Sequence, residues 1–144
     1  MRITTQGEYG LRCIRALAGS GKPLSIKEVC ASEKLSKPYV EQLFLKLRRA
    51  AIIKSLRGSK GGYVLAKSPS QIRVGEIIRA LEGDTFEVVC ERRSGRNRCI
   101  HIHECSLRSL WEALKERVDD LLDRVTLKTL QNDEDEVARR LRRL

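Results

Sequence analysis

Two short capped helices followed by a glycine-tipped hairpin, within residues 25–66, constrain the fold of this chain most strongly. Ser25 and Glu28 form a capping-box pattern, in which a hydroxyl and a carboxylate each satisfy a free backbone N–H at a helix start. Ser36 offers a second cap, and Pro38 stands in a first helical turn, where its missing N–H costs nothing. Two short helices joined by a tight turn are typical of a helix-turn-helix. These signals predict helices over 26–32 and 37–50.

A β-hairpin is predicted directly after the second helix. Residues 52–57 and 63–66 have the apolar and β-branched content of strands, and the glycine-rich stretch GSKGG separates them. A hairpin in this position makes the unit a winged helix. Arg57 and Lys60 flank the hairpin tip, and an arginine there suits the minor groove of DNA, whose negative potential is greatest where the groove is narrow.

The net charge is +10, and its position is more informative than its size. Residues 1–67 carry 14 Lys/Arg against 4 Asp/Glu, whereas residues 68–144 carry 15 of each. A local excess of positive charge indicates a surface for a polyanion, most simply double-stranded DNA. The alternative is a solvated basic face without a ligand. An enzyme is not expected, because there is no Ser/His/Asp arrangement and GSKGG leads into a strand rather than a phosphate-binding helix.

The second predicted helix divides its outward side chains by chemistry. Ser36, Tyr39 and Gln42 are hydrogen-bonding groups near its N-terminal end, and they are candidates for base edges and nearby phosphates in the major groove. Basic side chains are expected to meet phosphates, which fixes register without reading sequence. Glu41 could accept from a cytosine amine or pair with a lysine. The predicted DNA-contacting residues are Ser36, Lys37, Tyr39, Glu41, Gln42, Lys46, Arg49, Arg57 and Lys60, with Arg48 as a further phosphate contact.

The run CERRSGRNRCIHIHEC, residues 90–105, holds three of the five cysteines and both histidines. Three thiolates on one loop suit an iron–sulfur cluster, whose negative charge the arginines of the run would offset. Zinc is an alternative, since Cys99-x-His101-x-His103-x-Cys105 offers nitrogen and sulfur ligands, although without the tight Cys-x-x-Cys spacing of most structural zinc sites. Direct thiol sensing is a third interpretation, because neighbouring arginines favour the reactive thiolate.

The sequence predicts a soluble, cytoplasmic protein. No apolar run approaches the roughly 18 residues that a membrane span needs, and the opening MRITTQGEYG lacks the apolar stretch of a signal peptide. An odd number of cysteines in a reducing cytosol argues against a disulfide framework. Cys13 and Cys30 lie on apolar helix faces and are expected to be ordinary buried residues.

Helical periodicity predicts further helices at 4–18, 70–81 and, much longer, from residue 106 onward. The apolar stripe of the long helix is more than a small domain can cover, so a homodimer is the simplest partner surface. Two-fold symmetry would then present two winged helices to successive major grooves of a palindromic operator. The alternative is that this helix packs on its own domain.

The expected fold is mainly α with a β-hairpin wing. Its parts are a winged helix-turn-helix DNA-binding domain at 1–67, a connecting helix and cysteine-rich sensing loop at 68–105, a dimerisation helix at 106–130 and a charged, flexible tail at 131–144.

Several segments together carry a family resemblance: MRITTQGEYGLR, LSKPYVEQLFLKLRRA, SLRGSKGGYVLAK, VGEIIRALEG, and the three cysteines followed by LWEAL. Over residues 1–130 the chain resembles the IscR, NsrR and CymR group of bacterial winged-helix regulators, often called the Rrf type. The resemblance implies a dimeric transcriptional regulator in which an iron–sulfur cluster, sensing iron, redox state or nitric oxide, controls operator affinity. CymR-like members carry no cluster and respond through a metabolic enzyme.

The resemblance assigns three cluster ligands, Cys90, Cys99 and Cys105. The IscR pattern has a histidine three residues after the last cysteine, and this chain has Arg108 there. An NsrR-like arrangement would use Glu8 of the partner subunit as the fourth ligand, and His101 or His103 are local alternatives. A 2Fe-2S cluster is favoured, with 4Fe-4S as an alternative and structural zinc behind both.

Overall fold

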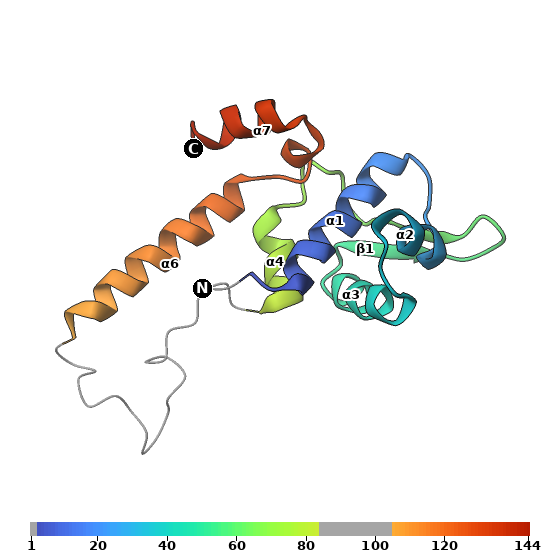
Figure 1. Ribbon diagram of the computed structural model, residues 1–144, viewed down its shortest axis with the longest axis horizontal. Helices are drawn as coiled ribbons and strands as arrows, with labels where there is room; N and C mark the ends of the chain where they lie inside the picture. The colour runs from blue at the N-terminus through green and yellow to red at the C-terminus, as the bar shows by residue number, and fades with distance from the viewer. Residues whose placement is uncertain (1–2, 84–104) are drawn as a thin grey trace, which may run out of the picture.

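The computed structural model describes residues 3–83 and 105–144, and the N-terminal helices with their hairpin and the C-terminal helices form distinct parts of it (Figure 1). The predicted class, mainly α with a two-stranded wing, is confirmed. The elements are α1 (Thr5–Ser20), α2 (Ile26–Glu33), α3 (Lys37–Arg49), β1 (Ile53–Leu56), β2 (Gly62–Leu65), α4 (Val74–Glu82), α6 (Ser106–Arg124), the 3-10 turn η2 (Thr129–Gln131) and α7 (Glu134–Leu141).

The predicted capping box starts α2. Glu28 N–H donates to Ser25 Oγ at 3.2 Å, and Ser25 N–H donates to Glu28 Oε2 at 2.7 Å. Hydrogen bonds from the Ser25 backbone, the Ser25 side chain and Lys22, in that order of size, lower the pKa of Glu28 from 4.5 to about 2. The second predicted cap is wrong in one detail. Ser36 is the N-cap of α3, but its side chain makes no capping hydrogen bond to the described residues, and Pro38 in the first turn removes one of the N–H groups that would need a cap.

The wing is an antiparallel pair in which Ile53 lies opposite Leu65 and Leu56 opposite Gly62. Leu24 extends the pairing, because its backbone exchanges hydrogen bonds of 3.1 and 2.8 Å with Tyr63. Gly62 is required at that crossing, since an added Cβ would lie 2.8 Å from the Leu24 carbonyl. The body of the domain therefore holds the hairpin along β2 as far as Gly62, next to the turn, and the exposed residues 57–60 form the turn beyond it.

One aliphatic core joins α1, α2, α3, β1 and α4. The stripe predicted for α3 is confirmed, with Val40, Leu43 and Leu47 at most 1% exposed. Phe44, on the same helix, packs edge-on against Tyr63 of the wing with ring centroids 4.9 Å apart. Helix α3 is thereby held against both the helical body and the hairpin.

Two predicted boundaries move because residues 72–74 and 125–127 pair as extended chain. Helix α4 begins at Val74 rather than at Ser70, since Ser68 and Gln71 close a turn with a 2.9 Å backbone hydrogen bond. Helix α6 ends at Arg124, short of the predicted residue 130. The amides of Val74 and Leu127 instead donate to Val125 and Ile72 carbonyls at 2.9 and 2.8 Å. Tertiary pairing overrides the helical periodicity at both places.

The tail at 131–144, expected to be flexible or only weakly helical, contains the helix α7 (Glu134–Leu141). Asp133 caps it by accepting from Glu136 N–H at 2.9 Å. Glu136 then pairs with Arg140 at 2.6 Å and with Arg139 at 2.9 Å. Acidic residues in the first turn and basic residues in the last complement the helix dipole, which accounts for a helix in so polar a segment. Among the described helices, none has the length and apolar character to cross a membrane.

Candidate nucleic-acid interface

The outward face of α3 is polar and exposed. Lys37, Glu41, Gln42 and Arg49 are solvent-exposed, whereas the opposite face is buried in the core. The Lys37 ammonium lies 3.7 Å from the Glu41 carboxylate, so Glu41 pairs with a lysine in this structure. Exposed pairs of this kind contribute at most about 1 kcal/mol, which leaves both groups available to a ligand.

The wing places a second set of cations beside α3. Arg57 and Lys60 are exposed at the hairpin tip, as predicted from the sequence, and Figure 1 shows this hairpin projecting from the body of the domain. Lys54 on β1 is also exposed and was not singled out in the sequence. The signal for it was its place directly after the apolar Ile53, which is buried, because successive side chains of a strand point to opposite faces.

Tyr39 is placed differently from the other predicted DNA contacts. It is half-buried, and its ring meets the Tyr9 ring edge-on at 6.1 Å. Its hydroxyl is buried and has no hydrogen-bond partner among the residues that the structure describes. Arg12 stacks over the same Tyr9 ring at 5.4 Å and pairs with Glu33 at 2.9 Å. Tyr39 therefore helps to hold α3 on α1, and its ring does not project outward as expected.

Lys46 also turns inward rather than toward solvent. Its ammonium donates to Gln6 Oε1 at 2.5 Å and to the Leu81 carbonyl at 2.8 Å. The adjacent Glu82 carboxylate accepts from Thr4 and Gly7 at the start of α1, in each case at 2.8 Å. The expected phosphate contact is thus engaged within the chain, at a junction of α1, α3 and α4. Sequence spacing did not reveal this junction, because its members lie far apart along the chain.

Of the predicted cluster ligands in the chain's own cysteine run, only Cys105 is described; Cys90, Cys99, His101 and His103 lie outside the described residues. Cys105 is the half-buried N-cap residue of α6, and its thiol makes no capping hydrogen bond to the described part of the chain. Arg108, where the IscR pattern has a histidine, pairs with Glu112 at 2.7 Å. Glu8 is exposed in the first turn of α1. Within the described ranges, no three His, Cys, Asp or Glu side chains gather as a metal site.

The remaining cysteines are part of the winged helix. Cys13 is fully buried, and burial is the main reason that its thiol pKa is raised to about 12. Cys30 is half-buried against the same core. A thiol with a raised pKa is a poor nucleophile and a poor metal ligand, which agrees with the structural role predicted for Cys13.

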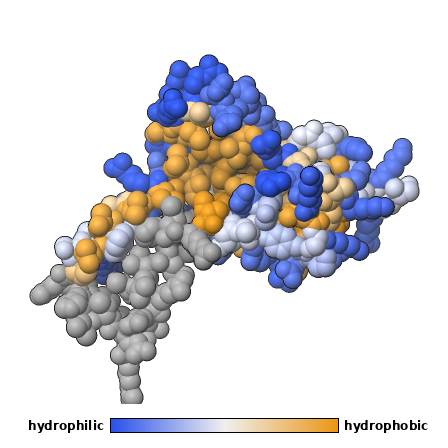
Figure 2. Space-filling view, viewed as in Figure 1, coloured by the Kyte–Doolittle hydropathy of each residue, from blue (hydrophilic) through white to orange (hydrophobic). Residues whose placement is uncertain are grey.

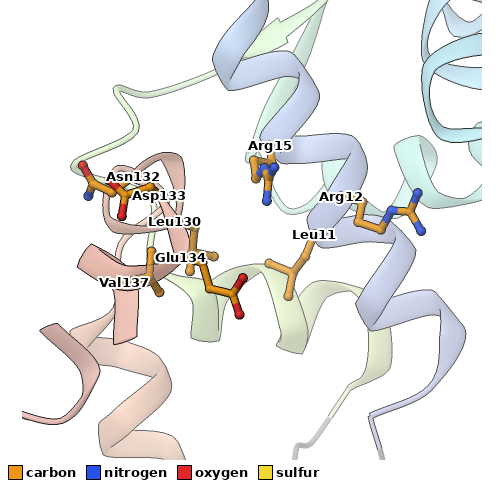
Figure 3. A pocket seen from close by; sticks show the side chains of 8 residues that line it. All are labelled: Leu11, Arg12, Arg15, Leu130, Asn132, Asp133, Glu134 and Val137. Carbon is orange, nitrogen blue, oxygen red and sulfur yellow. The ribbon is translucent and has the colours of Figure 1, made fainter. Parts of the chain in front are cut away.

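A pocket of about 490 Å³ lies between α1, η2 and α7 (Figure 3). Apolar side chains, Leu11, Leu130 and Val137, contribute to its lining. Arg15 and Glu134 bring opposite charges to it, and Arg12 and Asp133 repeat this balance. Because these charges cancel, the pocket does not suit a polyanion, and the basic face of α3 with the wing remains the candidate DNA surface.

The long helix α6 leaves its apolar stripe uncovered. None of its residues is buried in the part of the chain that the structure describes. Figure 1 shows α6 running away from the winged helix, and Figure 2 shows hydrophobic residues along it that continue into the patch where it joins the body. The exposed leucines, between 41% and 57% accessible, are Leu107, Leu110, Leu114 and Leu121. The described residues of one chain therefore leave this stripe exposed.

Comparisons with known proteins agree with this architecture. The family model Rrf2, described as an iron-dependent transcriptional regulator, matches residues 3–133. The chain is similar to the HTH-type transcriptional regulator CymR of Bacillus subtilis, with 39% identity over 90% of this chain and 89% of that protein. It is also similar to the HTH-type transcriptional regulator IscR of Yersinia pseudotuberculosis, with 34% identity over 97% of this chain and 86% of that protein.

A solved structure gives the same assignment. The structure of CymR, described as the global cysteine regulator of B. subtilis, superposes with a TM-score of 0.74 and 36% identity, covering 92% of this chain and 99% of that one. Sequence and fold similarity thus extend over both the winged helix and the C-terminal helices. The chain therefore belongs to the Rrf2 family, and it is a DNA-binding transcriptional regulator rather than an enzyme.

Proposed function

We propose that the chain is a homodimeric regulator that reads a palindromic operator and whose operator affinity is set by an iron–sulfur cluster. The observation that carries the DNA-reading part is the exposed polar face of α3 lying beside a wing with Arg57 at its tip. Gln42 and Glu41 would face base edges in the major groove, Arg57 would enter the minor groove, and Lys37 and Arg49 would hold phosphates. Lys46 would contact a phosphate only after its ammonium releases Gln6 and the Leu81 carbonyl.

The uncovered stripe of α6 supports the dimer. Nineteen residues at a rise of about 1.5 Å per residue make a helix about 28 Å long. A second copy of α6 would offer a stripe of the same length and chemistry, which a two-fold axis pairs with itself. The dimer would then carry two winged helices related by the same axis, as a palindromic operator requires.

Cys105 supports the cluster. It stands at the N-cap of α6, next to the predicted sensing loop, and its thiol makes no capping hydrogen bond to the described residues. Cys105 with Cys90 and Cys99 would hold the cluster, and Glu8 of the partner subunit, His101 or His103 would complete the coordination. A bound cluster supplies a centre that iron supply, redox state or nitric oxide can change. In one chain the start of α1, near Glu8, lies away from the start of α6 (Figure 1), so Glu8 would reach a cluster only across the dimer.

The similarity to CymR supports a second candidate, a cluster-free regulator. The chain is about as similar to CymR as to IscR, and Arg108 stands where the IscR pattern has a histidine. Such a regulator would respond to a protein partner or to thiol oxidation, or would hold structural zinc. Metal content separates the two candidates.

The test is anaerobic purification followed by iron, sulfide and zinc assays and absorption spectroscopy. The cluster proposal expects iron and sulfide in equal amounts, with visible absorption that Cys90→Ala, Cys99→Ala and Cys105→Ala each abolish. Cys30→Ala is the matched control, because it removes a half-buried thiol outside the predicted ligand set. Zinc without sulfide, or full iron binding by all three variants, would reject the cluster and favour the second candidate.

A further inference from the structure

The joint between α4 and α6 is built from more than apolar packing. The Arg79 guanidinium donates to Asp123 Oδ1 at 2.5 Å, and its other nitrogen lies 3.9 Å from Asp119. Arg73 donates to the Asp123 backbone carbonyl at 2.7 Å. A cationic side chain on a carbonyl at this end also complements the dipole of α6. Two arginines from α4 and its N-cap thus hold the last turn of α6.

Gly75 makes this approach possible. It is buried in the first turn of α4, and a Cβ added there would overlap Asp123 Oδ1 and lie 3.0 Å from the Arg79 guanidinium nitrogens. A side chain at residue 75 would therefore displace the Asp123 carboxylate from its position against α4. The glycine is explained by close approach of a neighbouring side chain, since its backbone has no need of a left-handed conformation.

The same joint connects the two functional parts of the chain. Below it, Val74 and Val125 pack together in a small cluster with Ile78. Beyond it, α6 projects with its leucines exposed, so the angle of α6 to the winged helix is set at its C-terminal end (Figure 1). On a lever about 28 Å long, a rotation of about 10° moves the far end by about 5 Å, which exceeds the ~3.4 Å of one base-pair step.

We infer that Arg79 is a positioning residue. By pairing with Asp123 where Gly75 leaves room, it sets the angle between α6 and the winged helix, and this angle sets the half-site spacing that the dimer accepts. The inference rests on the proposed dimeric DNA-binding function. In such a dimer the paired α6 helices form the common frame, and each winged helix is attached to that frame through this joint. Operator spacing is then specified by residues that never touch DNA.

The experiment uses the full-length protein and a palindromic duplex selected from a random library by the wild-type chain. Binding is measured by fluorescence anisotropy on that duplex, on versions with one base pair added or removed at the centre, and on a single half-site. We expect wild type to prefer one spacing by at least about 10-fold, and Arg79→Ala to lower this preference to under about 3-fold with unchanged half-site affinity. Arg79→Lys should restore part of the preference, because it keeps one charged donor.

Two matched controls isolate the joint. Arg140→Ala removes an arginine of similar exposure from an ion pair in α7, and it should keep the wild-type spacing preference. Gly75→Ala should relax or shift the preference with Arg79 intact, whereas Gly19→Ala, in α1 with open space around it, should not. Circular dichroism and size-exclusion chromatography verify that each variant is folded and dimeric.

Unchanged spacing preference in folded Arg79→Ala and Gly75→Ala dimers would overturn the inference. Equal weakening on every duplex, the half-site included, would also overturn it, because that outcome assigns Arg79 to general affinity or folding. If the wild-type chain selects no symmetric site, the proposed function fails first, and the inference fails with it. The wild-type selection therefore distinguishes the two failures.

Discussion

Helices α3 and α6 have the same kind of sequence and opposite surroundings. Both repeat apolar residues at steps of three and four. In α3 the stripe of Val40, Leu43 and Leu47 is at most 1% exposed, whereas in α6 Leu107 and Leu110 are more than half exposed. The apolar stripe of α3 is thus covered within one chain, whereas the described residues leave that of α6 exposed. An amphipathic pattern determines which face of a helix will be covered but not which molecule covers it.

The largest effect is expected in the winged helix, whose core is covered within one chain. Leu47→Ala leaves a cavity in the fully buried core beneath α3. Truncations of this kind cost about 2–5 kcal/mol of unfolding free energy. Chemical denaturation followed by circular dichroism measures the loss. A cost below 1 kcal/mol would show that this core is not as closely packed as the structure indicates.

The next prediction concerns the exposed leucine stripe of α6. Leu110→Glu with Leu114→Glu puts two charges on the exposed stripe of α6, so the dimer should dissociate while the winged helix stays folded. Operator affinity should fall by at least about 100-fold, because two linked half-site contacts become independent. Analytical ultracentrifugation and anisotropy measure both quantities. Glu116→Gln, on exposed α6 but outside the leucine stripe, is the control. A dimer that survives the double substitution would contradict the role given to α6.

A smaller effect sharpens what the winged helix contributes. Arg57→Ala should weaken operator binding by about 1–3 kcal/mol, which is roughly 5- to 150-fold, and should reduce the salt dependence of binding. Lys22→Ala is a suitable comparison, since it removes an exposed cation of the same domain that pairs with Glu28 rather than lying on the wing. Equal effects of the two substitutions would mean that the wing acts only through net charge.

The smallest effect concerns the cap of α2. The folded-state pKa of Glu28, about 2, lies below its ordinary value of 4.5. Its contribution to stability is therefore fully present above pH 4.5 and is lost as the pH falls toward 2. Glu28→Gln should lower the melting temperature slightly at neutral pH and flatten its decline over that window. Thermal melts from pH 7 to pH 2 check this, and identical slopes in both proteins would remove the capping box as the cause.

The sequence predicted local features well where neighbours along the chain determine them. Ser25 and Glu28 are three residues apart, so their reciprocal hydrogen bonds could be deduced directly. The GSKGG turn predicted the wing because it joins two strands that are neighbours along the chain. By contrast, the Lys46 ammonium meets the Leu81 carbonyl, and Glu82 caps the start of α1. Those contacts depend on how helices cross, which spacing does not encode.

By itself, the sequence determined the winged-helix class, the basic N-terminal half and the amphipathic character of α6, because periodicity, capping and charge are local properties. Only the tertiary structure decided that Lys46 and Tyr39 turn inward and that α6 ends at Arg124. The same holds for the ion pair of Arg79 with Asp123 beside Gly75. Each of these results from two segments competing for the same space or the same hydrogen bond, and that competition is settled only when the segments pack together.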